Sequence, residues 1–141
     1  MTTTTTSYLL VERFADAERA YACAVLHLGS AEIIEALPAG HFADPVARGI
    51  VELAGYLHRC GDTVDLVTVS LVRTQSPPNL SRDCVDVYTI PGAIPANWRA
   101  YREIVAEGHI RREAVKLAER ILRAAQESEL TTLVELVNNH E

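Results

Sequence analysis

The sequence predicts an all-α protein: a compact helical bundle followed by a C-terminal helical hairpin. Apolar residues recur at spacings of three and four along most of the chain, which is the period of an amphipathic helix. Glycines, prolines and capping residues separate these segments where helices would begin and end. The stretch richest in β-branched residues, GDTVDLVTVSL at 61–71, has no second alternating segment with which to pair in a sheet.

The first two expected helices lie at the start of the chain. A helix over 15–28 carries apolar residues on one stripe, and Gly29 ends it. Ser30 is placed to cap a short second helix, which ends at Pro38. Residues 1–14, which contain five consecutive threonines, are expected to form a flexible lead.

The next two helices are predicted from their capping residues. Asp44 precedes Pro45, and an aspartate N-cap followed by proline at the first helical position is a typical helix start. This helix is expected to end at Gly61. The run 66–74 is rich in valine and threonine, which favours a strand. Asp65 stands at an N-cap position, however, and packing often overrides propensity, so we expect 66–74 to be helical.

The C-terminal half of the sequence predicts a helical hairpin. Proline-containing breaks at 76–79 and 90–95 flank a short helix at about 81–89. A long helix follows at 96–126, and a turn leads from it to a short final helix. We therefore expect a globular bundle over 15–95, and the long helix and hairpin over 96–141.

Composition describes an ordinary single-domain protein of 141 residues. No apolar run approaches the roughly 20 residues of a membrane helix, and the N-terminus lacks the features of a signal peptide. Three cysteines, odd in number and far apart, fit reduced thiols in a cytoplasm. The net charge of −6 argues against attraction to nucleic acid over the whole surface.

Catalytic motifs are lacking in the sequence. Lys116 is the only lysine, and it lies in a helical pattern instead of the glycine-rich turn that a P-loop requires. No GxSxG motif occurs, and Asp83 with Asp86 is more typical of a solvated helix face than of a catalytic carboxylate pair. We therefore expect no enzyme activity, no nucleotide binding and no cofactor.

Two cysteine–histidine pairs raise the alternative of a zinc site. Cys23 and His27 are one helical turn apart, and His58 and Cys60 end another helix. Structural zinc sites usually present ligands as CxxC or HxxxH pairs, and neither pair has that form. The sequence favours a buried cysteine and two surface histidines, so no metal site is predicted.

The long helix has two contrasting faces in its second half. One is an apolar stripe that includes Ile110, Leu117 and Ile121, and the final short helix adds apolar residues of its own. The other is a basic face. Three roles for that face stay open: a solvated surface, a contact with an acidic partner, or a contact with a nucleic-acid backbone. The basic face comprises Arg112, Lys116, Arg120 and Arg123, next to His109.

Four segments together resemble the N-terminal domain of DnaB-type replicative helicases. They are ERAYACAVLHLG (18–29), HFADPVARGIVELAGYLHRCG (41–61), GDTVDLVTVSL (61–71) and PANWRAYREIVAEGHIRREAVKLAERI (95–121). They occur in the family's order, and the segment like 61–71 is helical in that family. One departure is SPPNLSRDCVDVYTI (76–90), which stands where the family has a glycine-glycine turn and a helix.

The resemblance implies a scaffold role in DNA replication. In that family the domain pairs through its hairpin, helps to build the hexamer collar, and offers a docking surface to primase or helicase loaders. The RecA-like motor of the family is not among these residues, which would make the chain an excised domain or a stand-alone relative. By this reading the partners are a second copy and a helicase, primase or loader, with DNA bound only weakly or indirectly. The expected dimer interface comprises Ile110, Leu117, Ile121, Leu130, Leu133 and Val137.

A competing hypothesis is a small regulator of plasmid or phage type. Such a protein would bind a host helicase, or would bind DNA through the basic face. DNA binding measured at several salt concentrations separates the two readings, since phosphate contacts give a steep dependence on salt.

Overall fold

The computed structural model describes residues 3–72, 80–127 and 130–139, and within them the chain is helical without strands. The prediction of an all-α fold is confirmed. In chain order the elements are α1 (Thr3–Leu28), α2 (Ala31–Ala36), the 3-10 turn η1 (Ala39–His41), α3 (Pro45–Arg59), α4 (Leu66–Leu71), α5 (Leu80–Tyr88), the 3-10 turn η2 (Pro95–Asn97), α6 (Trp98–Gln126) and α7 (Leu130–Asn138).

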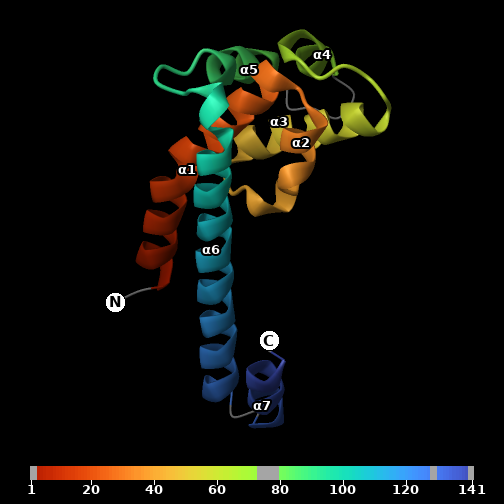
Figure 1. The fold of residues 1–141 in the computed structure, drawn as a ribbon. Coiled ribbons are helices and arrows are strands. Elements are labelled where there is room, and N and C mark those ends of the chain that lie inside the picture. The colour runs from red at the N-terminus through yellow and green to blue at the C-terminus, as the bar shows by residue number, and fades with distance from the viewer. Residues whose placement is uncertain (1–2, 73–79, 128–129, 140–141) are drawn as a thin grey trace.

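The molecule consists of a bundle and a long arm (Figure 1). Helices α2 to α5 and the C-terminal half of α1 form the bundle at one end. Helix α6 starts in the bundle and runs away from it, beside the N-terminal half of α1, and α7 lies beside the far end of α6. We call the part of α6 that follows Gly108, together with α7, the arm.

The core is built around the C-terminal half of α1. Every residue from Tyr21 to Leu26 is buried, because this part of α1 packs against α3, α5 and α6. The Tyr21 ring lies against Phe42 and Trp98, with ring centroids 5.5 and 6.3 Å away. Its hydroxyl donates a hydrogen bond to the carbonyl of Ile33, so the one polar atom of this buried ring is satisfied.

Two aspartate caps predicted from the sequence are present. The Asp44 carboxylate accepts a hydrogen bond from the Ala47 N–H at 3.0 Å, which starts α3. Asp65 and Thr68 form a reciprocal capping box, at 2.8 and 2.9 Å, which starts α4. The valine- and threonine-rich stretch is therefore helical, as expected. Helix α4 ends at Leu71.

Some boundaries differ from the expected ones. Helix α4 was expected to reach residue 74, but residue 72 is already extended, and residues 73 and 74 lie outside the described part of the chain. Helix α1 begins at Thr3 instead of near residue 15, so it includes most of 1–14, the segment expected to be a flexible lead. Extending a helix that has already formed costs far less than nucleating one, which is the physical reason for the longer α1.

Glycine ends α1 and α3 as predicted. Gly29 and Gly61 both have positive φ, at 58° and 77°, which residues other than glycine rarely adopt. A side chain at Gly29 would also collide with the carbonyl of Val64, so the end of α1 lies directly against the segment before α4. Among the described helices, none combines the length and apolar character needed to span a membrane.

Candidate protein-interaction surface on the arm

One side of α6 faces the bundle and α1. Trp98, Val105 and Gly108 are buried along this side, at spacings of seven and three residues. Helices α1 and α6 approach each other so closely at Gly108 that a Cβ atom there would lie 2.9 Å from Cγ of Phe14 on α1. Phe14 is itself only 2% exposed. This contact fixes which side of α6 is covered by the rest of the chain.

The predicted apolar stripe lies on the opposite side of α6. A helix turns by about 100° per residue, so Ile110 lies about 200° around the axis from Gly108. Ile110 is 65% exposed, whereas Leu117 and Ile121 are half-buried. Ala124, further along the same side, is buried where α7 packs against α6. The stripe is therefore covered near α7 and open toward the bundle.

Helix α7 presents apolar residues to solvent as well. Val134 and Val137 are 47% and 55% exposed. Leu130 and Leu133, which were expected at the same interface, belong to α7, but their side chains lie outside the described part of the structure. Leu122 on α6, 56% exposed, was missed by the sequence analysis because it lies about 100° around the helix from Ile121, away from the stripe.

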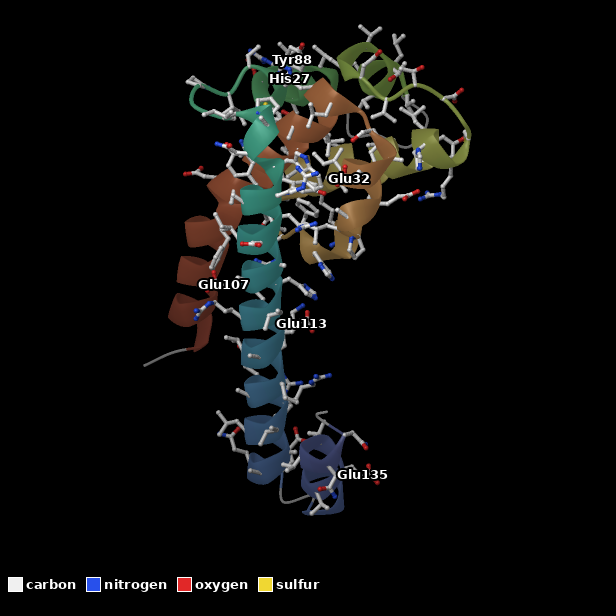
Figure 2. All side chains as sticks on the ribbon, viewed as in Figure 1. His27, Glu32, Tyr88, Glu107, Glu113 and Glu135 are labelled. Carbon is white, nitrogen blue, oxygen red and sulfur yellow. The ribbon has the colours of Figure 1, made fainter. Side chains whose placement is uncertain are left out.

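The basic face is smaller than the sequence suggested. Lys116, Arg120 and Arg123 are exposed, and they line a shallow hollow on α6. Lys116 is paired with Glu113 at 3.2 Å, and Figure 2 shows Glu113 midway along α6. The placement of Arg112 on this face was wrong: its side chain is only 13% exposed and points toward the bundle.

Helical spacing explains the position of Arg112. It follows Gly108 by four residues and Val105 by seven, and so lies on the bundle side of α6. Its Nη2 donates a hydrogen bond to the carbonyl oxygen of His41 at 2.8 Å, and its Nη1 lies 3.6 Å from Oε2 of Glu18. Arg112 therefore joins the arm to both α1 and η1.

Glu18 is a fully buried carboxylate that the sequence analysis did not single out. Its Oε1 accepts hydrogen bonds from the backbone N–H groups of Ala43 and Asp44, at 2.6 and 2.8 Å. Burial raises the pKa of Glu18, while the bond from Asp44 N–H and the charge of Arg112 oppose that rise. The feature of the sequence that could have identified Glu18 is its place on the buried stripe of α1, three residues before Tyr21, where an acidic residue is unusual.

Two further contacts surround Glu18. Arg19 binds the Asp44 carboxylate through two hydrogen bonds, each 3.1 Å long. The rings of His41 and His109 stack with centroids 3.9 Å apart, which attaches η1 to α6 a second time. Burial, helped by the charges of His109 and Arg112, lowers the pKa of His41.

Three of the four residues in the cysteine–histidine pairs, Cys23, His27 and His58, make other contacts. His27 stacks on Tyr88 and its Nε2 lies 2.9 Å from the Tyr88 carbonyl oxygen, at the bundle end of the molecule (Figure 2). The Cys23 thiol lies 3.6 Å from the same oxygen. His58 pairs with Glu35 at 2.9 Å. In the described part of the chain, no three such side chains form a group suited to a metal ion.

Comparison with known proteins supports the fold. No protein-family model matches the sequence, and no curated protein matches it. The structure is similar to the crystal structure of the N-terminal domain of DnaB helicase from Mycobacterium tuberculosis, with a TM-score of 0.70 and 24% sequence identity. The match covers 86% of this chain and 89% of that chain. The resemblance read from the sequence is confirmed at the level of the fold, and this chain has the fold of the N-terminal domain of DnaB helicase.

Proposed function

We propose that this chain is an oligomerisation and protein-docking module that acts in DNA replication and pairs with a second copy through its arm. The observation that supports the proposal most directly is the open apolar stripe on α6, on the side opposite the bundle. The similarity in fold to the N-terminal domain of a replicative helicase supports the replication context.

The lengths of the two helices explain why the stripe needs a partner. Helix α6 has 29 residues and α7 has 9, which correspond to about 44 and about 14 Å. Ile110 lies about 24 Å from the end of α6 at Gln126, beyond the reach of α7. A helix this long is usually supported along its length by packing. The half of the stripe around Ile110 has no such support from its own chain among the described residues.

A two-fold pairing of arms would cover the open half of the stripe. In such an interface the same surface serves both copies, so the part of α6 near Ile110 on one copy meets α6 or α7 of the other. Exposed Val134 and Val137 extend the apolar surface onto α7. Exposed Arg120 and Arg123 lie outside the stripe and would be available to an acidic surface of a helicase, primase or loader.

Sedimentation equilibrium of three variants tests the pairing. Ile110→Asp places a charge in the proposed interface, and the side chain is exposed in the single chain, so the fold should be retained. We expect the wild type to be dimeric at micromolar concentrations and Ile110→Asp and Leu117→Asp to be monomeric, because an unpaired buried charge costs several kcal/mol. Val67→Asp, at a 64% exposed apolar residue of α4 in the bundle, is the matched control and should stay dimeric.

Two results would contradict the dimer. A monomeric wild type would rule out the dimer. A dimeric mass for Ile110→Asp, equal to that of the wild type, would place the interface away from the stripe. Circular dichroism of each variant establishes that the helices are intact.

The second candidate function is DNA binding through the basic face. Exposed Arg120 and Arg123 favour it, but Arg112 is directed inward, and Lys116 is already paired with Glu113. We expect weak binding with a shallow dependence on salt. A steep salt dependence that is lost in Arg120→Glu would instead identify phosphate contacts and favour the regulator.

A further inference from the structure

We infer that Arg112 and Glu18 hold the arm in a fixed direction relative to the bundle, so that breaking this ion pair releases the arm without unfolding either part. This inference concerns the shape of a single chain and does not depend on the proposed dimer. It rests on where the pair lies and on how its atoms are bonded.

Arg112 lies where α6 leaves the bundle. The bundle-facing residues before it are Trp98, Val105 and Gly108, all buried. Beyond it, the only buried residue of α6, whose residues are all described, is Ala124, at the end where α7 packs. Arg112 is therefore the last residue of α6 with a described side-chain bond to the bundle. A contact at the point of departure has the largest effect on the direction of the helix beyond it.

The pair joins three elements. Glu18 belongs to α1, and its Oε1 is used by the N–H groups of Ala43 and Asp44, which start α3. Its Oε2 faces Nη1 of Arg112 at 3.6 Å, and neither of these two atoms has a hydrogen-bond partner among the described residues. Arg112 also binds the His41 carbonyl. Moving the arm therefore separates one buried carboxylate from Arg112, its cationic neighbour within 4 Å among the described residues.

The surrounding charges leave Arg112 without a substitute. Arg19, an arginine next to Glu18 on α1, is engaged with both oxygens of Asp44, which in turn caps α3. An isolated buried carboxylate is strongly disfavoured, so the chain gains from keeping Arg112 in place. The ion pair therefore restrains the direction of α6 in addition to apolar packing at Gly108.

The contact is also easily weakened. At 3.6 Å the two charges attract each other but are too far apart for a good hydrogen bond. Burying both groups costs solvation energy, which a pair at this distance repays only in part. Loss of either charge should therefore change the direction of the arm more than it changes the helices themselves.

Distance measurements between spin labels test the inference. Cys60 in the bundle is exposed, whereas Cys23 and Cys84 are buried, so one native cysteine accepts a label in the folded protein. A second label is attached to Gln126→Cys, an exposed residue at the end of α6. Dilution with unlabelled protein restricts the measured distances to single chains, whether or not the protein pairs.

Two substitutions remove the ion pair in different ways. Arg112→Met keeps the length of the side chain and removes its charge, and Glu18→Gln keeps an oxygen for the two N–H donors and removes the other charge. We expect both to give a broadened or shifted distance distribution with an unchanged helical signal. Lys116→Met, one turn along α6 and exposed, is the matched control and should give the wild-type distribution.

Three results would overturn the inference. Wild-type distance distributions in folded Arg112→Met and Glu18→Gln would show that packing alone directs the arm. The same broadening in Lys116→Met would make the effect unspecific. Loss of helical signal in both pair variants would make the ion pair a requirement for folding instead of a restraint on the arm.

Discussion

The close contact between α1 and α6 at Gly108 makes a quantitative prediction about two glycines. Gly108 and Gly55 both lie inside helices, so replacing either with alanine gains the same intrinsic helix preference, about 1 kcal/mol. Their surroundings differ. A Cβ at Gly108 would lie 2.9 Å from Cγ of buried Phe14 and 3.1 Å from Nη1 of Arg112. A Cβ at Gly55 would meet only the mobile end of Arg59, at 3.3 Å.

The two substitutions should therefore differ in their effect on stability. Overpacking of a tight contact costs about 1–3 kcal/mol, so we expect Gly108→Ala to leave the unfolding free energy unchanged or to lower it by up to about 2 kcal/mol. Gly55→Ala should raise it by up to about 1 kcal/mol, since the Arg59 side chain can move aside. Because the helix preference cancels, the difference between the variants measures the steric cost at the α1–α6 contact.

Urea unfolding followed by circular dichroism supplies the measurement. The midpoint should be unchanged or lower in Gly108→Ala and higher in Gly55→Ala, with the same slope in both. Phe14→Ala should weaken the effect of Gly108→Ala, because it removes the Cγ atom that the new methyl group would meet at 2.9 Å. Equal stabilisation by the two alanines would refute the reasoning, since it would mean that α1 and α6 separate freely at this point.

Two further predictions concern a cap and a histidine. Asp65→Ala removes the capping box of α4 and should cost about 1 kcal/mol of unfolding free energy, whereas Asp62→Ala, at an exposed residue before α4, should cost little; equal losses would contradict the role of the cap. Burial lowers the pKa of His41, so the unfolded chain binds more protons below about pH 6.5 and stability should fall on acidification. The raised pKa of Glu18 changes stability in the opposite direction, so the wild type must be compared with a variant that lacks His41. We expect His41→Asn to lose less stability than the wild type between about pH 7.5 and about pH 5.5. Equal losses in the two proteins would contradict this prediction.

Features that depend on neighbouring residues were predictable from the sequence. Asp44 and Asp65 each cap a helix through a residue three positions later, so the interaction is visible in a short stretch of sequence. Gly29 and Gly61 end helices for a similarly local reason. These signals were sufficient to interpret a valine-rich stretch as a helix and to obtain the correct order of elements.

Features that depend on distant residues were not predictable in the same way. The partners Glu18 and Arg112 lie on different helices, and neither residue type indicates the other. Arg112 was assigned to the outer face because the charges were grouped by type. Its spacing from Val105 and Gly108 places it on the bundle side, but this becomes evident only when α1 is known to lie there. The exposure of Ile110 followed from its position on the opposite side.

The double use of Asp44 has a consequence for local motion. The Asp44 carboxylate both caps the start of α3 and binds Arg19 on α1, while the backbone N–H of Asp44 donates a hydrogen bond to Glu18. Opening the first turn of α3 therefore requires breaking contacts with α1 as well. The two helices should behave as one cooperative unit, in which the amide hydrogen of Ala47 exchanges with solvent only when α1 and α3 separate.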